Sequence, residues 1–308
     1  MNIGALLRYY RKLKNLSQND LAELADVNEK YYSKIERDEN NPTYAILNRI
    51  VNALDMKMTQ FSIAADEYCS YDYLFFPENA KSGVFIREVP PRFVAEVQYQ
   101  DRLMEVYVAS SFKLSKRLNL YNSKVNLLKI EEDSRFKYSI FSLDHNTIKI
   151  ILNLNVVNKL FYELYCTGML SGYHWYGVGK PEVTCLNYKT DFYFEQEKIV
   201  IENKTIVSEN ASCSYPIEKS KRIMEQLKKI EELLDDGYNV RINFFILTPW
   251  TNKIWFEKDF ENAMDMLKCK GMKEYVYYMY YEKDILRVQR AIFEKTEDEY
   301  CNIKFYNK

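Results

Sequence analysis

The stretch from Glu182 to Lys204 constrains the fold of this chain more than any other, because it reads as two strands joined by a tight polar turn. The segments TDFYF and KIVIEN are rich in β-branched and aromatic residues and flank an acidic turn. If this turn is centred between residues 196 and 197, strict antiparallel pairing places Asp191 opposite Glu202. Side chains alternate faces along a strand, so Glu202 and Lys204 project to the same side. The hairpin therefore predicts a cluster of Asp191, Glu202 and Lys204 on one face.

Two carboxylates that meet across a strand ladder repel each other, so this cluster needs a cation. Oxygen ligands without sulfur or imidazole nearby suit Mg²⁺ or Mn²⁺. A lysine beside such a metal can orient or deprotonate an attacking water molecule. The alternative interpretation is an ordinary exposed hairpin whose acidic and basic residues face water.

An Asp followed about ten residues later by Glu-x-Lys resembles the PD-(D/E)xK nuclease signature. The neighbouring motifs narrow the resemblance: they are Glu182, Asp191-Phe192, Glu202-Asn203-Lys204, Tyr215-Pro216 and Ser220-Lys221-Arg222. Together they are similar to the rE…DF…EVK…FP…(S/T)xR progression of the sugar fermentation stimulation protein (SfsA) family, whose members are described as DNA-binding proteins and DNA/RNA nucleases. Here Asn203 stands in place of Val and Tyr215 in place of Phe, and neither change removes a ligand. The resemblance implies a metal site formed by Glu182, Asp191 and Glu202, with Lys204 beside it.

The composition is that of a folded soluble protein, since 47% of the 308 residues are hydrophobic and 28% are charged. This length allows two or three domains. The net charge of -1 leaves any nucleic-acid contact to local patches. Six scattered cysteines without a Cys-x-x-Cys pair, and two histidines, argue against a zinc site and favour reduced thiols in a cytoplasmic protein. Neither an 18-residue apolar run nor a signal-peptide pattern occurs, so we expect no membrane span and no export.

Apolar residues recur at helical spacing through residues 2–65, which predicts five short helices. Ser17 is a natural N-cap, with Asp20 at the position where a capping box carries Glu. The segment is similar, nearly end to end, to the helix-turn-helix of the phage-repressor (Cro/cI, or XRE) family. The matching residues are Leu16-Ser17-Gln18, Leu21-Ala22, Val27, Ile35-Glu36 and Asn41-Pro42.

This second resemblance implies that residues 28–38 are a recognition helix in the major groove of DNA. The candidates for DNA contact at its start are Asn28, Glu29, Lys30 and Lys34. Gln18, at the positive end of the preceding helix, is expected to lie against a phosphate. Asp38 stands where the family often has Gly, which bears on the geometry of the turn. The alternative is a fold that mediates protein contacts only.

Helical periodicity fails after this region, and proline and glycine punctuate residues 67–91, which we interpret as a linker. Residues 92–152 then alternate as strands at 93–97, 104–108, 125–130, 138–143 and 148–152, which predicts a small β-barrel. The SfsA-like family has an OB-like domain at this position, and RFVAEV resembles its opening. OB barrels commonly bind single strands through a basic groove and stacking aromatic rings. The candidates here are Arg92, Tyr107, Phe112, Lys113, Lys116 and Arg117, and the alternative is a purely structural β-domain.

Residues 153–308 predict a mixed α/β sheet of the restriction-endonuclease type, because strands and helices alternate along them. The expected elements are a helix at 153–168, the hairpin, a helix at 220–236, a strand at 240–247, a helix at 259–268 and a strand at 274–281. Arg222 begins the second helix on the side where the site is expected. There it could contact a phosphate or remain an ordinary solvated charge. The tail 284–308 has no functional interpretation.

The sequence thus predicts a multidomain chain: an all-α helix-turn-helix domain at 1–66, an OB-like β-barrel and a restriction-endonuclease-like mixed α/β domain. The favoured function is a Mg²⁺-dependent DNA/RNA nuclease brought to duplex DNA by the helix-turn-helix. One such domain contacts only a half-site, so we expect a homodimer that reads two half-sites ~34 Å, or a multiple of it, apart. The rivals are a non-enzymatic transcriptional regulator, whose nuclease-like domain serves dimerisation or sensing, and a toxin- or defence-type nuclease that controls its own expression.

Overall fold

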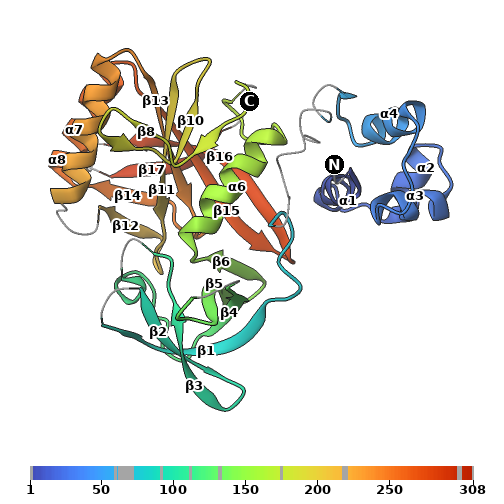
Figure 1. The fold of residues 1–308 in the computed structure, drawn as a ribbon, viewed down its shortest axis with the longest axis horizontal. Helices are drawn as coiled ribbons and strands as arrows, with labels where there is room; N and C mark the ends of the chain where they lie inside the picture. Colours follow the sequence, from blue (N-terminus) through green and yellow to red (C-terminus); the bar gives the residue numbers. More distant parts are fainter. Residues whose placement is uncertain are drawn as a thin grey trace. The chain divides into compact units, whose positions relative to one another are not determined.

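A computed structural model of the chain describes residues 3–58, 61, 73–90, 93–110, 113–130, 134–173, 176–216, 221–296 and 300–306 (Figure 1). The chain divides into two compact units. The first contains residues 1–78, 159–175 and 281–286, and the second contains residues 79–158, 176–280 and 287–308. In the described ranges, no helix is both long and apolar enough to cross a membrane.

The first unit opens with four short helices, as the helical spacing predicts: α1 (Ile3–Leu13), α2 (Gln18–Leu24), α3 (Glu29–Glu36) and α4 (Tyr44–Ala53). Ser17 and Asp20 form the predicted capping box at the start of α2. Asn28 and Thr43 cap the next two helices through their side-chain oxygens. The fifth predicted helix lies mostly outside the described residues. The sequence therefore specifies these helix starts locally, because each cap satisfies backbone N–H groups that the helix itself leaves without partners.

A buried polar network joins three helices of this unit. The Glu36 carboxylate accepts hydrogen bonds from Arg11 Nε at 2.5 Å and Nη2 at 2.9 Å, from the Tyr32 hydroxyl at 2.5 Å, and from Gln18 Nε2 at 2.7 Å. Burial opposes the charge of Glu36, but these donors outweigh it and hold the pKa of the carboxyl below its usual value. Removing one partner would leave a buried charge unpaired, so the network fixes how α1, α2 and α3 pack.

The turn after α3 accommodates Asp38 where the helix-turn-helix family often has Gly. Asp38 has a φ of 56°, in the left-handed region that Asp tolerates better than most residues. Its Oδ1 atom also accepts a hydrogen bond of 2.9 Å from the backbone N–H of Gly4. A Cβ atom at Gly4 would lie 2.6 Å from the Glu36 carbonyl oxygen, so only glycine allows this close approach of α1.

The second unit begins with five strands: β1 (Lys81–Val89), β2 (Val94–Tyr99), β3 (Arg102–Tyr107), β4 (Lys124–Lys129) and β5 (Tyr138–His145). β1 pairs with β2 and β4, β2 with β3, β3 with β5, and β5 with β4, so the pairings close on themselves. β6 (Ile148–Ile151) continues from β5, and the 3₁₀ turn η1 (Leu114–Lys116) lies between β3 and β4. The strands predicted between residues 93 and 152 are therefore present.

β1 corrects the predicted linker. Residues 81–89 of the proposed linker 67–91 form a paired strand, whereas residues 67–72 and 91 lie outside the described residues. Position 83 requires glycine within this strand, because a Cβ atom there would lie 2.5 Å from a Val97 methyl group. The glycine therefore marks a tight approach between strands instead of a flexible connection.

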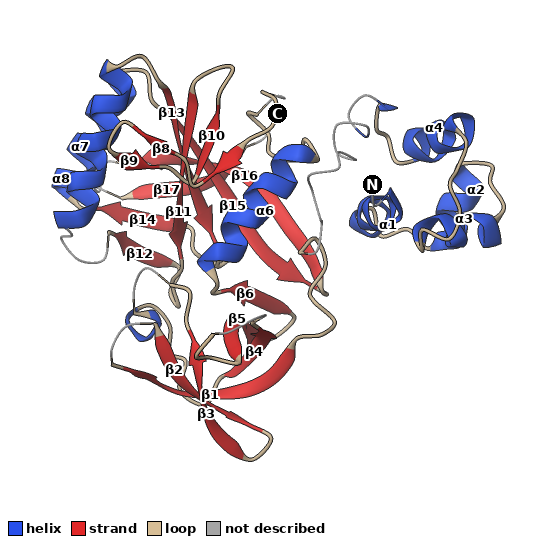
Figure 2. Ribbon diagram, in the orientation of Figure 1, coloured by secondary structure: helices blue, strands red, loops and turns tan. Residues whose placement is uncertain are grey.

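The rest of the second unit is built on a parallel core of β11 (Ile199–Ile206), β13 (Asn239–Ile246) and β15 (Lys273–Glu282), the last of which runs on into the first unit. The helices α7 (Lys221–Asp235) and α8 (Lys258–Cys269) lie side by side (Figure 2) and contribute apolar side chains to one core with these strands. β10 (Phe192–Phe194) pairs antiparallel with β11 and with β7 (Lys180–Pro181). The helix α6 (Leu154–Cys166) precedes this sheet in sequence.

Several strands were not predicted. β12 (Ser212–Tyr215) pairs with β14 (Lys253–Phe256), and β14 pairs with β17 (Cys301–Phe305), which in turn pairs with β16 (Ile285–Lys295). β8 (Thr184–Cys185) and β9 (Tyr188–Lys189) form a separate short hairpin. The tail 284–308 is therefore largely part of the sheet, and its mixed charged and aromatic pattern reflects strands with one buried and one exposed face.

Candidate active site and nucleic-acid interface

The β10–β11 ladder has the predicted register. Phe192 pairs with Ile201 and Phe194 with Ile199, and the Asp191 N–H donates to the Ile201 carbonyl at 3.2 Å. This register places Asp191 next to Glu202 at the start of the pairing. Glu202 lies inside β11, and the other edge of β11 pairs with the parallel strand β13.

Glu202 and Lys204 form a buried ion pair on one face of β11. Lys204 Nζ lies 2.6 Å from Glu202 Oε1, and their side chains are 11% and 8% exposed. Lys204 Nζ also donates to Gln226 Oε1 on α7 at 3.1 Å. Burial alone would lower the pKa of Lys204, but the charge and hydrogen bond of Glu202, together with neighbouring acidic groups, outweigh burial and raise that pKa. Lys204 is therefore a cation at neutral pH, which suits orienting water or stabilising negative charge and does not suit removing a proton.

Asp191 is held by two donors from different elements. Its Oδ1 atom accepts from Asn158 Nδ2 on α6 at 2.9 Å, and its Oδ2 atom accepts from the Asn203 backbone N–H at 2.7 Å. Burial and the neighbouring Glu202 charge raise the pKa of Asp191 to about 7, although both hydrogen bonds and Lys204 act in the opposite direction. The second carboxylate raises this pKa because two like charges at close range disfavour ionisation of both groups.

Asparagine side chains connect this carboxylate to the centre of the sheet. Asn203 Nδ2 donates to Asn158 Oδ1 at 3.0 Å, and Asn243 Nδ2 on β13 donates to Asn203 Oδ1 at 2.8 Å. Asn203 is the residue that replaces the Val of the family triplet, so this chain of amides depends on that departure. Our sequence reasoning missed Asn243 and Gln226. A single polar residue inside the apolar run RINFFIL was the available signal for Asn243.

Glu182 does not join the two carboxylates. Its carboxylate is 73% exposed and pairs with Lys189 at 2.7 Å, while only its backbone N–H contacts Asp191, through the carbonyl oxygen at 3.1 Å. Within the ranges that the structure describes, no three His, Cys, Asp or Glu side chains are grouped as a metal site. The predicted three-carboxylate set is therefore not assembled, because β8 and β9 direct Glu182 towards Lys189.

Arg222 lies exposed in the first turn of α7, as expected from its position in sequence. Burial and the nearby Glu202 carboxylate raise the pKa of Tyr188, and the charge of Arg222 acts against that rise. Arg222 is thus close enough to act electrostatically on Tyr188, which is itself a neighbour of Glu202.

The donor set fits a hydrated hard cation. Asp191 and Glu202 supply only oxygen, and each carboxylate has about four lone-pair sites, so the hydrogen bonds described above leave acceptor capacity. Mg²⁺ commonly binds through one or two carboxylates and keeps several waters. A pair of carboxylates therefore suffices for such an ion, and Mn²⁺ has the same ligand preference.

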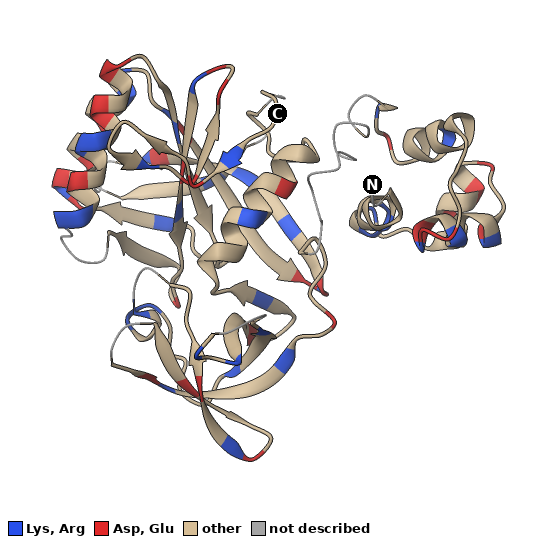
Figure 3. Ribbon diagram, in the orientation of Figure 1, with Lys and Arg blue, Asp and Glu red and all other residues tan. Residues whose placement is uncertain are grey.

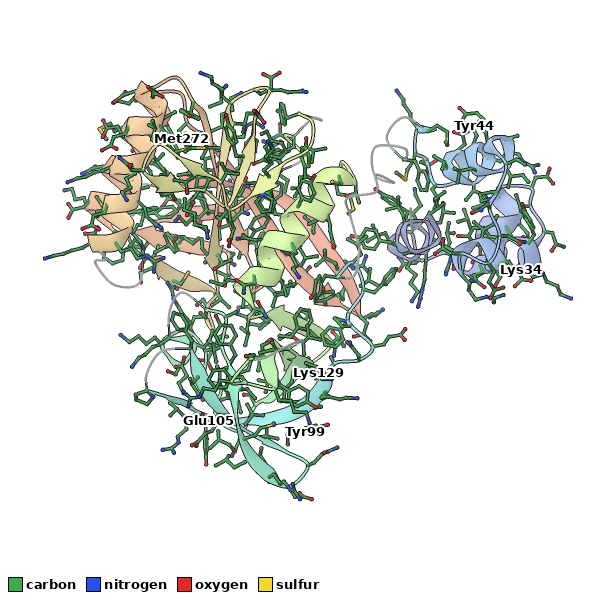
Figure 4. The ribbon with its side chains drawn as sticks, in the orientation of Figure 1. Lys34, Tyr44, Tyr99, Glu105, Lys129 and Met272 are labelled. Carbon is green, nitrogen blue, oxygen red and sulfur yellow. The ribbon has the colours of Figure 1, made fainter. Side chains whose placement is uncertain are left out.

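The helix-turn-helix places its predicted contact residues at the surface of α3. Glu29, Lys30 and Lys34 are exposed, and Lys34 points outwards from its helix in Figure 4. Asn28 uses its side-chain oxygen to cap α3, where it accepts from the Tyr31 N–H at 3.2 Å. Sequence reasoning did not single out Arg37, which is exposed one turn after Lys34.

The Gln18 side chain is directed towards Glu36, to which its amide nitrogen donates. An amide nitrogen carries two hydrogens, so this bond fixes the side chain and is compatible with the predicted phosphate contact.

The described candidates for single-strand binding, all between residues 92 and 152, are separated. Lys113, Lys116 and Arg117 line one cavity, whereas the Tyr107 ring stacks on Phe136 with centroids 6.2 Å apart. Arg92 and Phe112 lie outside the described residues.

Comparison with known proteins identifies two regions of the chain. The sequence profile of a helix-turn-helix family matches residues 7–61, and that of the sugar fermentation stimulation protein RE domain matches residues 155–287. The chain carries a helix-turn-helix domain and an SfsA domain. The second match contains Asp191, Glu202 and Lys204.

Individual relatives support both domains. The SfsA homologue of Desulforamulus reducens is 24% identical over 168 residues, which cover 53% of this chain and 69% of the homologue. The structure of Pyrococcus furiosus SfsA in complex with Ca²⁺ is 18% identical, with a TM-score of 0.59 over 71% of this chain and 96% of that one. The helix-turn-helix domain is 39% identical over 59 residues to the transcriptional regulator SlrR of Bacillus subtilis, and the match spans 19% of this chain and 39% of SlrR.

Proposed function

We propose that this protein is a divalent-metal-dependent nuclease of the PD-(D/E)xK type, brought to duplex DNA by its helix-turn-helix. The observation that carries the proposal is the convergence of Asp191, Glu202 and Lys204, with the lysine ammonium 2.6 Å from the Glu202 carboxylate. Two carboxylates can hold a divalent cation that activates water for phosphodiester hydrolysis, and a lysine beside it can orient that water. The Ca²⁺ complex of Pyrococcus furiosus SfsA supports a cation on this fold.

Asp191 and Glu202 would hold Mg²⁺ or Mn²⁺, which would supply Lewis-acid stabilisation of the phosphate and a more acidic water. The hydrogen bonds from Asn158 and the Asn203 backbone fix the orientation of Asp191. Lys204, a cation shielded from solvent, would orient the attacking water and stabilise negative charge on the phosphate oxygens. Arg222 would contact a phosphate of the substrate from the start of α7.

Targeting would come from the helix-turn-helix domain. Asn28, Glu29, Lys30 and Lys34 would face the major groove, and Gln18 would contact a phosphate. A homodimer would read two half-sites, and the OB-like and nuclease-like domains would hold single-stranded DNA or RNA. Light scattering at micromolar concentration, with and without operator-like duplex DNA, measures the predicted dimer.

The test is cleavage of plasmid, single-stranded DNA and RNA by the full-length protein, in Mg²⁺, Mn²⁺ or EDTA, with Asp191→Asn as the matched inactive variant. The expected result is metal-dependent cleavage by the wild type and none by the variant. Equal activity of both proteins would assign the cleavage to a contaminant. No cleavage by the wild type with any metal or substrate would overturn the proposal.

A specific observation favours the second candidate, a non-enzymatic transcriptional regulator. The Glu182 carboxylate is engaged by Lys189, and the 39% identity to a regulator lies in the helix-turn-helix domain. In that case the SfsA domain would serve dimerisation or sensing. Sequence-specific duplex binding by a protein that never cleaves would favour this function over the first.

A further inference from the structure

The hydroxyl of Tyr188 is a buried polar group that the proposed mechanism does not use. The tyrosine is 5% exposed, and in the part of the chain that the structure describes no hydrogen bond of normal geometry reaches its hydroxyl. Burial and the charge of Glu202 raise the pKa of Tyr188, so the carboxylate lies beside the hydroxyl even though no such bond joins them. A buried hydroxyl of this kind costs free energy, and a functional role or a bound ligand is the usual reason for keeping one.

The β8–β9 hairpin fixes where this side chain points. Cys185 pairs with Tyr188 across the hairpin, and both side chains are buried. The turn residues Leu186 and Asn187 are exposed. Charged residues of both signs lie along α7 (Figure 3), and one of them, Lys229, donates to the Asn187 carbonyl at 3.2 Å. The hairpin is therefore held on α7 with the tyrosine directed inwards.

Tyr188 belongs to the apolar core that α7 and α8 form with one face of the sheet. Val200 and Ile206 of β11 are in the same core. Because side chains alternate faces along a strand, Glu202 and Lys204 share the face of these two residues. The tyrosine and the Glu202–Lys204 ion pair therefore lie on the same side of β11.

The hairpin that brings Tyr188 inwards also turns Glu182 outwards. Lys189 binds the Glu182 carboxylate at 2.7 Å, and both side chains are exposed. Lys189 follows Tyr188 directly in β9, so alternation places the two on opposite sides of the strand. The hairpin thus withholds one carboxylate from the site and supplies one hydroxyl.

Glu202 has acceptor capacity for this hydroxyl. Lys204 Nζ lies 2.6 Å from its Oε1 atom, and a carboxylate has about four lone-pair sites in all. A divalent cation on Glu202 would compete with the lysine ammonium for these oxygen atoms and so favour a neutral donor such as a phenol. Donors of this kind orient metal-binding carboxylates, and their loss typically weakens metal binding about 10- to 100-fold.

We propose that Tyr188 is a positioning residue of the cation site, whose hydroxyl donates to Glu202 when that carboxylate holds a divalent cation. The tyrosine acts through Glu202 and touches neither the cation nor the substrate. The inference rests on the metal binding of the proposed function, and it does not depend on cleavage.

The test is calorimetric titration of Mn²⁺ into the full-length Tyr188→Phe variant at pH 8, above the pKa of Asp191, together with urea unfolding in EDTA. The variant should bind Mn²⁺ about 10- to 100-fold more weakly than the wild type. Its unfolding midpoint in EDTA should not fall, because phenylalanine keeps the ring in the core and removes a hydroxyl that makes no normal hydrogen bond there.

Tyr278→Phe is the matched control. Tyr278 is a buried tyrosine of the same core, and its hydroxyl donates to the Thr251 carbonyl at 2.6 Å. Removing that hydroxyl should lower the unfolding midpoint and leave the Mn²⁺ affinity unchanged. If Tyr188→Phe gives this same result, the tyrosine has only a structural role and the inference is overturned.

Cleavage assays separate this inference from the proposed function. If the wild type cleaves, Tyr188→Phe should need more Mn²⁺ for its half-maximal rate and approach the wild-type rate at saturating Mn²⁺, since the carboxylates and Lys204 are intact. Cleavage by the wild type with unchanged Mn²⁺ affinity in the variant would keep the nuclease and overturn the role of Tyr188. Weaker Mn²⁺ binding by the variant of a protein that never cleaves would support that role and overturn the nuclease. No Mn²⁺ binding by the wild type at pH 8 would overturn both.

Discussion

Binding of a divalent cation should depend steeply on pH below neutrality, because Asp191 must lose a proton before it can hold a metal. In the cation-free protein, burial and the Glu202 charge raise the pKa of Asp191 to about 7. At pH 6 this carboxyl therefore keeps its proton, whereas an ordinary aspartate is ionised there. A cation that requires the ionised form competes with one proton.

The size of the effect follows from this competition. The apparent dissociation constant rises about tenfold for each pH unit below the pKa, so Mn²⁺ should bind about tenfold more weakly at pH 6 than at pH 8. The stability of the folded protein depends on pH in the opposite direction. Because the pKa of Asp191 is higher in the folded state, its contribution to stability without a cation is largest in acid and is lost as pH rises through about 7. Added Mn²⁺ should remove that decline.

Isothermal titration calorimetry of Mn²⁺ at pH 6, 7 and 8 measures the affinity, and two buffers of different ionisation enthalpy count the released protons. Thermal melting with and without Mn²⁺ over the same pH range checks the stability half of the prediction. Asp191→Asn serves as the control and should bind weakly at all three pH values. Equal affinity of the wild type at pH 6 and pH 8, with no proton release, would refute the reasoning.

Lys204→Met should abolish cleavage and leave duplex binding unchanged, measured on one preparation; a variant that cleaves at the wild-type rate would remove the lysine from the site. Lys30→Ala with Lys34→Ala should weaken duplex binding by about 1–3 kcal/mol for each lost base contact in an electrophoretic shift assay at fixed salt, and unchanged binding would place the interface elsewhere. Asn203→Val should cost about 1–3 kcal/mol in urea unfolding, because it removes the donor to Asn158 Oδ1 and the acceptor of the Asn243 amide, and a variant of wild-type stability would show that these groups find other hydrogen bonds. Glu36→Ala should destabilise the helix-turn-helix domain by about 3–5 kcal/mol, because the buried Arg11 would lose its carboxylate partner. Unfolding monitored by helical circular dichroism measures this change. A much smaller loss of stability would mean that water reaches the arginine.

Local sequence signals were sufficient to predict most of the helices and strands. The capping box of Ser17 and Asp20 and the apolar spacing of residues 2–54 predicted the helix starts, because caps and amphipathic periodicity act within one or two turns. The strand register that brings Asp191 to Glu202 was likewise readable, since a tight turn fixes pairing by counting residues outwards. The strands β1, β12, β14, β16 and β17 were missed, because their mixed polar and apolar patterns resemble loops until a partner strand is known.

By itself, then, the sequence determined the helix-turn-helix, the hairpin and the pairing of one aspartate with one glutamate and one lysine. Tertiary structure alone decided which distant groups surround them. Asn158 and Asn243 reach the site from α6 and β13, and Glu182 turns away to Lys189, because each position depends on elements far apart in the chain. The charge state of these groups was also a tertiary outcome, since burial and neighbouring charges, which no local pattern encodes, set their pKa values.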